Sequence, residues 1–247
     1  MSNPVNVKTP LPEIRGMARE TILLNTAGPM GITMLLFLIR LNLSSIPLLF
    51  TASENIIAVF FGELLSLVIN VALGVLLAGR AKYYIQICDR KAGSVKMLFG
   101  AFRENPGRIL AGAFVLCIIE FFCTLPSFIY SIFYPVKFEN TKETYIAFAL
   151  LFGGFILYQL VTLAFMPLYY IFAEFSNMPA GKAIRMSIWL MKGNKTRLLK
   201  LMISLVPLWI LGYVSFGLGF LWISPIIQSN YAHFYLDLIK QKQGQPT

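Results

Sequence analysis

Long apolar runs that alternate with short basic segments limit this chain to few folds. Between Met166 and Tyr235, for example, an apolar run leads into a basic amphipathic segment, and two further apolar runs follow. A helix of ~20 apolar residues is long enough to cross the ~30 Å hydrocarbon core of a bilayer. The alternation therefore predicts an all-α fold, specifically a polytopic membrane protein.

The balance of charged and apolar residues supports this prediction. Only 13% of the 247 residues are charged, whereas an ordinary soluble domain has about 25%. The net charge of +10 is concentrated between the apolar runs, which is where basic residues flank membrane spans. We therefore expect the lipid bilayer, and no nucleic acid, to be the partner of this basic surface.

The apolar runs divide the chain into six predicted spans. They form one membrane domain over residues 11–242, between a flexible cytoplasmic tail at 1–10 and a second tail at 243–247. Arg40 either closes the first span or lies inside a span that starts later. One helix through the last two runs is the alternative to a hairpin, but the glycines of Gly217–Gly219 favour a turn. The predicted spans are residues 21–41, 55–77, 109–132, 145–172, 198–214 and 220–239.

Two basic segments are predicted to form amphipathic interfacial helices on the cytoplasmic side. In the first, apolar residues between Val95 and Phe102 follow helical spacing. In the second, from about Pro179 to Met191, a basic stripe lies opposite an apolar one. Such helices lie in the membrane interface with their basic face toward anionic headgroups. The residues expected to contact headgroups are Lys96, Arg103, Lys182, Arg185, Lys192 and Lys195.

The distribution of basic residues predicts the orientation of the chain. Of the 21 Lys and Arg residues, all except Arg40, Lys137 and Lys142 fall near the two termini or in the two long connections. Basic residues accumulate on the cytoplasmic side of membrane proteins. Both termini and both long connections are therefore predicted to be cytoplasmic.

The two basic connections resemble each other and suggest an internal repeat. The same tripeptide opens each of them, at Tyr83–Ile85 and Tyr169–Ile171, and Arg108 later corresponds to Arg197. A third aromatic pair, Phe234–Tyr235, ends the last span, so the last and first spans could form a third, split unit. Such copies run in the same direction and would be related by an axis along the membrane normal. The alternative is that membrane interfaces select Tyr and Lys in any case.

Four polar side chains are predicted to lie inside the hydrocarbon. A carboxylate there must pair, face water or stay protonated, and Glu63 is the most reachable partner of Arg40. The four groups either line a proton- or ion-coupled path or tie helices together by hydrogen bonds worth ~0.6 kcal/mol each. We favour the second interpretation. These candidate intramembrane residues are Arg40, Glu63, Asn70 and Glu120.

A second polar group is expected at the cytoplasmic ends of the fourth and sixth spans. His233 and Asp237 are i, i+4 neighbours, so the carboxylate could orient the imidazole. No spacing typical of metal ligands, such as His-Glu-x-x-His, occurs. We therefore predict a structural polar knot rather than a metal site. Its members are Glu174, Asn230, His233 and Asp237.

No motif in the chain predicts catalysis or a cofactor. A nucleophile elbow, a phosphate-binding loop and a dinucleotide fingerprint are all absent from the sequence. The three cysteines do not make a disulfide framework or a metal site. We expect an accessory or scaffolding protein that acts through partner helices or anionic lipid. A small transporter or channel using Glu63 and Glu120, and an intramembrane enzyme near His233, are the alternatives.

Residues 174 to 235 carry a pattern that resembles a known family. Pro179 follows the acid Glu174, and Met191–Lys195, Gly217–Gly219 and Ala232–Tyr235 come next. The pattern is similar to that of the bacterial integral membrane family known as domain of unknown function 975. This resemblance implies a six-span protein of the bacterial cytoplasmic membrane without an established activity. The sequence departs from the family where Glu174 replaces the more frequent Asp.

Overall fold

The structure, a computed structural model, describes residues 8–51, 55–134 and 141–243. Most of the expected N-terminal tail and the last four residues of the C-terminal tail lie outside these ranges. Every regular element within them is a helix, as predicted. In chain order they are α1 (Leu11–Leu24), α2 (Ala27–Thr51), α3 (Ile56–Cys88), α4 (Lys96–Gly100), α5 (Pro106–Phe133), α6 (Thr141–Thr162), the 3₁₀ turn η1 (Leu163–Phe165), α7 (Leu168–Glu174), α8 (Ala180–Met191), α9 (Lys195–Val214) and α10 (Phe220–Gln243).

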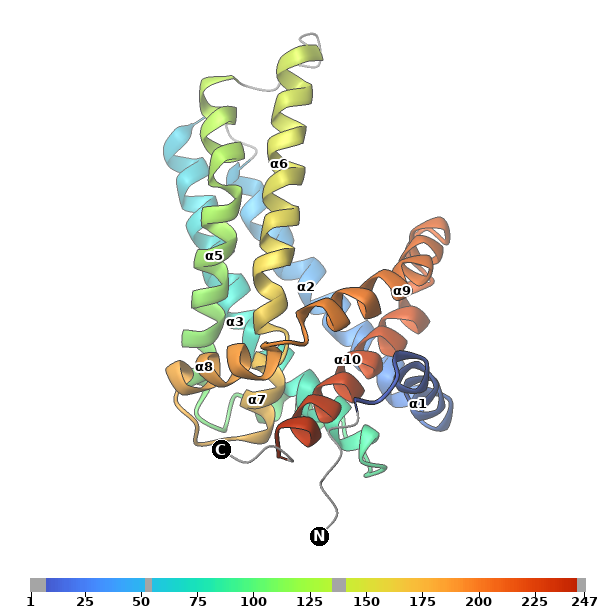
Figure 1. Cartoon of the computed structure of the whole chain (residues 1–247). Coiled ribbons are helices and arrows are strands. Elements are labelled where there is room, and N and C mark those ends of the chain that lie inside the picture. The colour runs from blue at the N-terminus through green and yellow to red at the C-terminus, as the bar shows by residue number, and fades with distance from the viewer. Residues whose placement is uncertain (1–7, 52–54, 135–140, 244–247) are drawn as a thin grey trace.

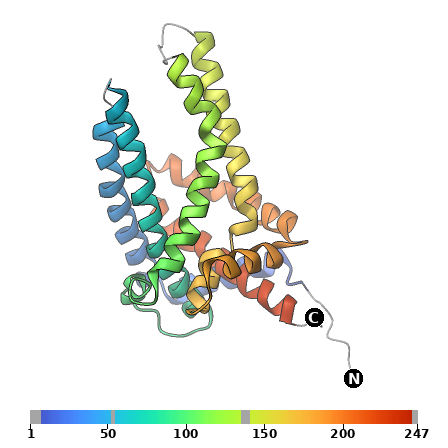
Figure 2. The same cartoon turned by 90° about the vertical axis from the view of Figure 1, so that its left-hand side faces the viewer.

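Four long helices form an upright bundle. α2 packs on α3, α3 on α5, and α5 on α6 (Figures 1 and 2). The short helices α1, α4, α7 and α8 gather at one end of this bundle, where the end of α10 also lies (Figure 1). We call this end the inner end. It carries the two basic connections that the charge pattern predicts to be cytoplasmic.

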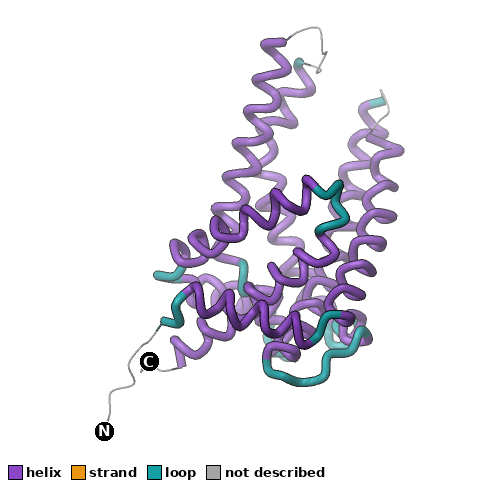
Figure 3. Tube along the Cα trace, turned by 90° about the vertical axis from the view of Figure 1, so that its right-hand side faces the viewer, coloured by secondary structure: helices purple, strands orange, loops and turns teal. Residues whose placement is uncertain are grey.

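The last two helices form a hairpin, which excludes the alternative of one continuous helix. α9 and α10 turn at residues 215–219 and run obliquely to the four-helix bundle (Figures 1 and 3). α10 packs against α1, α2, α3 and α9. This helix therefore forms the centre of the inner end, and the fully buried Phe234 and Tyr235 lie on it.

Five described helices, rather than six, are long and apolar enough to cross a membrane. They are Ala27–Phe50, Ile57–Cys88, Pro106–Tyr130, Lys142–Glu174 and Lys195–Val214. The expected sixth span, α10, is not among them because it carries Asn230, His233, Asp237 and Lys240. Its polar residues are compatible with its position inside the inner end rather than against lipid.

Two span boundaries differ from the sequence prediction. The first span begins at Ala27, after a break between α1 and α2, so Arg40 lies inside it. Asn25 and the nearby Gly28 and Pro29 explain this break, because such residues favour turns. The fourth span is interrupted by η1 just before Pro167, which has no N–H to continue the helix.

The surface of the bundle is strongly apolar away from the inner end. Phe60 of α3, Phe122 of α5 and Phe152 of α6 are 69%, 65% and 64% exposed. Contiguous exposed apolar surface of this kind is typical of proteins that contact lipid or other proteins. With the five long apolar helices, it identifies the chain as a membrane protein.

The two predicted interfacial helices are both anchored on the bundle. α4 has only five residues, and it approaches α3 so closely that a Cβ at Gly79 would collide with the backbone of Leu98. α8 buries the face that contains Ala183, Ser187 and Leu190, and Ser187 donates to the Ala164 carbonyl at 2.9 Å. The apolar stripe expected from the sequence contains Ile184, Ile188 and Met191. Ile188 is 44% exposed, so the buried face of α8 is rotated from that stripe.

Candidate functional site at the inner end

The predicted intramembrane polar residues do not form the expected pair. Arg40 and Glu63 make no ion pair among the described residues. Arg40 instead lies close enough to Glu120 of α5 for their charges to interact. Asn70 donates to the Ser66 carbonyl at 2.9 Å on its own helix. These side chains therefore do not converge on one point.

The four residues of the predicted polar knot make four separate sets of contacts, and the largest set contains Asp237. The Arg197 guanidinium donates to the Asp237 carboxylate, with Nη1 and Oδ2 2.5 Å apart. Thr9 Oγ1 and Gln241 Nε2 also donate to this carboxylate, at 2.5 and 2.6 Å. Arg197 additionally donates to the Thr9 carbonyl. This buried ion pair therefore joins α9 and α10 to the segment that precedes α1.

His233 bonds to Thr21 of α1 and not to Asp237, contrary to our prediction. Its Nε2 lies 2.9 Å from the Thr21 hydroxyl oxygen, and this hydroxyl donates its proton to the Met17 carbonyl. Nε2 therefore carries a proton and donates to Thr21. Burial, followed by the nearby Lys240, lowers the pKa of His233. A His that donates to the hydroxyl is not placed to activate it as a nucleophile.

The other two members of the predicted knot also bond elsewhere. The Tyr235 hydroxyl donates to the Glu174 carboxylate, which links α10 to the end of α7. Asn230 donates to the Ile226 carbonyl at 2.8 Å, and its side-chain oxygen is buried without a partner among the described groups. No group of three or more His, Cys, Asp or Glu that could hold a metal occurs within the described residues.

A cavity around Arg80 is the feature that the sequence analysis missed. It has a volume of about 150 Å³ and lies between α3, the η1–α7 segment and α10. Arg80, Tyr169, Tyr170, Gln228 and Tyr231 supply its polar lining, and Leu77, Ala81 and Met166 its apolar lining. An arginine in a wall of tyrosines can bind an anion through several N–H and O–H donors.

Contacts between tyrosines hold the side chains in and around this cavity in place. The Tyr170 ring stacks on Tyr235 with centroids 5.2 Å apart, and its hydroxyl is 3.5 Å from the Gln228 carbonyl oxygen. Tyr84, one turn after Arg80, is fully buried and packs edge-on against Tyr83. Its hydroxyl lies near Thr33 but has no hydrogen-bond partner among the described residues.

The aromatic pairs of the internal repeat could have indicated this cavity. Arg80, Met166 and Tyr231 each precede the first residue of an aromatic pair by three positions. All three line the cavity. The repeat therefore brings equivalent positions together at the centre of the inner end, although Arg occupies only one of them.

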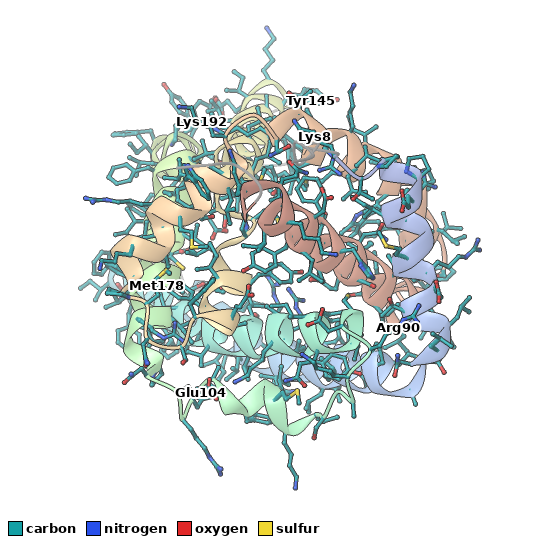
Figure 4. All side chains as sticks on the ribbon, turned by 60° about the horizontal axis from the view of Figure 1, so that its bottom comes forward. Lys8, Arg90, Glu104, Tyr145, Met178 and Lys192 are labelled. Atoms are coloured by element: carbon teal, nitrogen blue, oxygen red, sulfur yellow. The ribbon has the colours of Figure 1, made fainter. Side chains whose placement is uncertain are left out.

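The six residues expected to contact headgroups are all exposed at or near the inner end. We call Lys96, Arg103, Lys182, Arg185, Lys192 and Lys195 the basic rim. Figure 4 looks toward this end and shows Lys192, Arg90 and Glu104 on different sides of the molecule. Glu104 forms an ion pair at 2.7 Å with Lys82, which is not part of the basic rim, and no described ion pair involves a residue of the rim.

A family model described as "Protein of unknown function (DUF975)" matches residues 9–242. The chain belongs to this family. The match covers all the described helices except the last residue of α10, Gln243, and confirms the resemblance found in residues 174–235. No curated protein and no solved structure gives a significant match. The family and the apolar helices together identify a membrane protein of unknown role.

Proposed function

We propose that this chain is an accessory protein of the bacterial cytoplasmic membrane that acts through anionic lipid and partner helices, with both termini cytoplasmic. The observation that carries the proposal is the basic rim, because its exposed cations lie beside exposed apolar side chains at one end of the molecule. Amphipathic surfaces of this composition bind the headgroup region of anionic membranes.

α4 and the turn after it supply the first membrane-binding element. Val95, Phe99 and Phe102 are 42%, 46% and 45% exposed. Lys96 and Arg103 are exposed next to them in the chain. Aromatic rings inserted among the headgroups, with basic side chains beside them, would fix the depth of the inner end in the membrane.

α8 supplies the second membrane-binding element. Ile188 and Trp189 are 44% and 48% exposed, while Lys182 and Arg185 are exposed on the preceding turns. Because the opposite face of α8 is packed on the bundle, the exposed side chains are held toward the surroundings. Each Lys or Arg near an anionic surface contributes about 1 kcal/mol to its binding.

Neutralising the basic face of α8 tests the proposal. The variant Lys182→Gln, Arg185→Gln, Lys192→Gln should retain at least several-fold less anionic lipid during purification, measured by mass spectrometry of the bound lipid. The matched control, Lys182→Arg, Arg185→Lys, Lys192→Arg, keeps every charge and should retain the lipid of the parent protein. An unchanged lipid content in the Gln variant would exclude this role.

Transport is the second candidate function, and the electrostatic interaction between Arg40 and Glu120 favours it. Tyr158 of α6 interacts electrostatically with both residues, and Tyr169 of the cavity wall interacts with Tyr158 and Arg80. Ionisable residues within spans often mark ion pathways. A chain of such electrostatic interactions would extend a polar path from the middle of the bundle toward the inner end.

Proton flux into proteoliposomes distinguishes the two candidates. A transporter should show a flux that Glu120→Gln abolishes. Glu63→Gln is the matched control, because Glu63 is exposed on α3 and lies outside the contacts just described. Absence of flux in the parent protein would leave the accessory role as the function supported by the structure.

A further inference from the structure

We propose that the cavity around Arg80 is a binding site for a small oxyanion, namely a phosphate group. This group comes either from a lipid headgroup or from free inorganic phosphate. The inference does not depend on the basic rim, whose residues are absent from the cavity lining.

The first step of the argument is the missing counter-charge of Arg80. No carboxylate forms an ion pair with it in the part of the chain that the structure describes. The charged residue that acts on it is Arg40, which has the same sign. Arg80 is partly buried among aromatic side chains, and a guanidinium in such surroundings is stabilised by a bound anion.

The second step is the chemistry of the donors around Arg80. Tyr169 and Tyr170 lie close enough to interact with its charge, and Tyr231 completes the wall. A guanidinium presents five N–H donors in a planar fork that matches the geometry of phosphate. Tyrosine hydroxyls add further donors, while no carboxylate lines the cavity to repel an anion.

The size of the cavity sets the kind of anion. Its volume of about 150 Å³ is several times the ~10–15 Å³ that a cavity needs, on the same measure, to hold one water molecule. A phosphate group fits this space, whereas the glycerol and acyl chains of a lipid would have to remain outside. The site would thus accept a free phosphate or the phosphate end of a headgroup.

The depth of Arg80 agrees with a headgroup ligand. α3 begins at Ile56, and a helical rise of 1.5 Å per residue places Arg80 about 36 Å further along its axis. The hydrocarbon core is only ~30 Å thick. If the start of α3 lies at the far edge of this core, Arg80 reaches the phosphate layer on the inner side.

The internal repeat supports a dedicated role for Arg80. The equivalent positions in the other two units are Met166 and Tyr231, and both line the same cavity. An apolar or aromatic residue is therefore compatible with the framework at this position. Arginine is thus a special feature of one unit, as expected if it recognises a ligand.

Thermal unfolding of the purified full-length protein in detergent tests this site. Inorganic phosphate and a short-chain phosphatidylglycerol are titrated separately, with sodium chloride at equal ionic strength as reference. We expect at least one phosphate compound to raise the unfolding temperature in a saturable way. Stabilisation by phosphate alone identifies a free-anion site, and stabilisation by the lipid alone or more strongly identifies a headgroup site.

The variants show whether Arg80 is the ligand. Arg80→Gln should abolish the saturable shift, and Arg80→Lys, which keeps the charge but loses the fork, should weaken binding at least tenfold. Arg90→Gln is the matched control, since Arg90 has an 81% exposed side chain, and it should bind like the parent protein. The triple Gln variant of the basic rim should also keep the shift, which separates this site from the proposed function.

Two results would overturn the proposal. The first is the absence of a shift beyond that of chloride with both phosphate compounds. The second is an unchanged shift in a folded Arg80→Lys protein together with an unchanged shift in Tyr231→Phe. Because Arg80→Lys preserves the charge, a failure of Arg80→Gln to fold does not prevent this conclusion.

Discussion

His233 and Asp237 lie one turn apart on α10, yet they bond to different elements. The carboxylate of Asp237 accepts a hydrogen bond from Arg197 of α9, and the imidazole of His233 forms a hydrogen bond with Thr21 of α1. A hydrogen bond between two ionised groups is about twice as strong as a neutral one, so a guanidinium outcompetes an imidazole for the carboxylate. Helical spacing predicts which residues are neighbours on one helix, but it does not predict which charged side chain of another helix lies beside them.

Removal of the Asp237 charge should destabilise the protein strongly. Asp237→Asn leaves Arg197, whose side chain is 13% exposed, without a counter-charge. Breaking a buried pair in this way costs about 3–5 kcal/mol. Asp89→Asn is the matched control, because its pair with Lys91 is long, at 3.6 Å, and exposed, so the loss should stay below about 1 kcal/mol. Similar unfolding temperatures for the two variants in detergent would contradict the structural role of Asp237.

The stability of the protein should depend on pH through His233. Since burial lowers its pKa, the unfolded chain takes up a proton more readily below pH ~6.5 than the folded protein does. Stability should therefore fall as the pH drops through this value. His233→Gln can still donate to Thr21, should cost about 1 kcal/mol at pH 7.5, and should lose less stability than the parent protein between pH 7.5 and 5.5. An equal or larger loss in the variant would contradict this account.

At the scale of helices, equivalent arginines make equivalent contacts in the repeated units. Arg108 at the start of α5 donates to the Phe172 carbonyl at 2.8 Å, and Arg197 at the start of α9 binds Asp237. Phe172 and Asp237 each lie three residues after the first member of an aromatic pair. Each unit thus contacts the same position of the next unit. These contacts favour an internal duplication of the chain over the alternative, that membrane interfaces select aromatic and basic residues in any case.

In the third, split unit, the start of α2 corresponds to the starts of α5 and α9 in the other two units. Asn25 lies two residues before α2, while Asn105 and Asn194 lie directly before α5 and α9. Three residues after Asn25, Gly28 lies so close to Tyr83 that a Cβ there would collide with the Tyr83 hydroxyl. The third unit therefore contacts the aromatic pair of the first unit, and its two spans, α10 and α2, pack on each other.

The α9–α10 turn has the properties of a turn that lies in lipid. Phe216 is 99% exposed, and Val214 and Leu218 are each 70% exposed. Every backbone N–H from Ser215 to Ile223 donates within the hairpin, that of Gly219 to the Ser215 hydroxyl. Hydrocarbon excludes turns chiefly because their backbone groups lack partners. In addition, the turn lies well short of the far end of the bundle (Figure 1).

We therefore expect a cysteine at Phe216 to be shielded from water on both sides. In a background without the three native cysteines, Phe216→Cys should not react with an impermeant maleimide in intact cells or in inverted vesicles. It should react once the protein is dissolved in detergent. Ser94→Cys, in the loop before α4, is the control and should react in inverted vesicles. Reaction of Phe216→Cys from outside would contradict this expectation. It would show that the hairpin crosses the membrane, in agreement with the prediction of six spans.

At the scale of the whole molecule, the sequence predicts the helices well but does not predict which of them meet at the inner end. Apolar length identifies five of the six predicted spans, because the cost of exposing a helix backbone to lipid is a local property. The cavity around Arg80 is different, since α3, α7 and α10 supply its walls. Local periodicity does not indicate contacts between residues that are more than a hundred positions apart. Only the internal repeat indicated that these segments have equivalent positions.

The last prediction concerns the orientation of the whole molecule. The basic rim and both described chain ends lie at the inner end (Figure 1), so one labelling experiment tests them together. In the cysteine-free background, Ser53→Cys and Asn140→Cys, in the connections after α2 and α5, should react with impermeant maleimide in intact cells. Ser94→Cys and Ser176→Cys, beside α4 and α8, should react only in inverted vesicles. The positive-inside rule requires this outcome because moving the many cations of the inner end across the membrane is unfavourable. The reverse pattern would place the basic rim outside the cell and remove the basis of the proposed function.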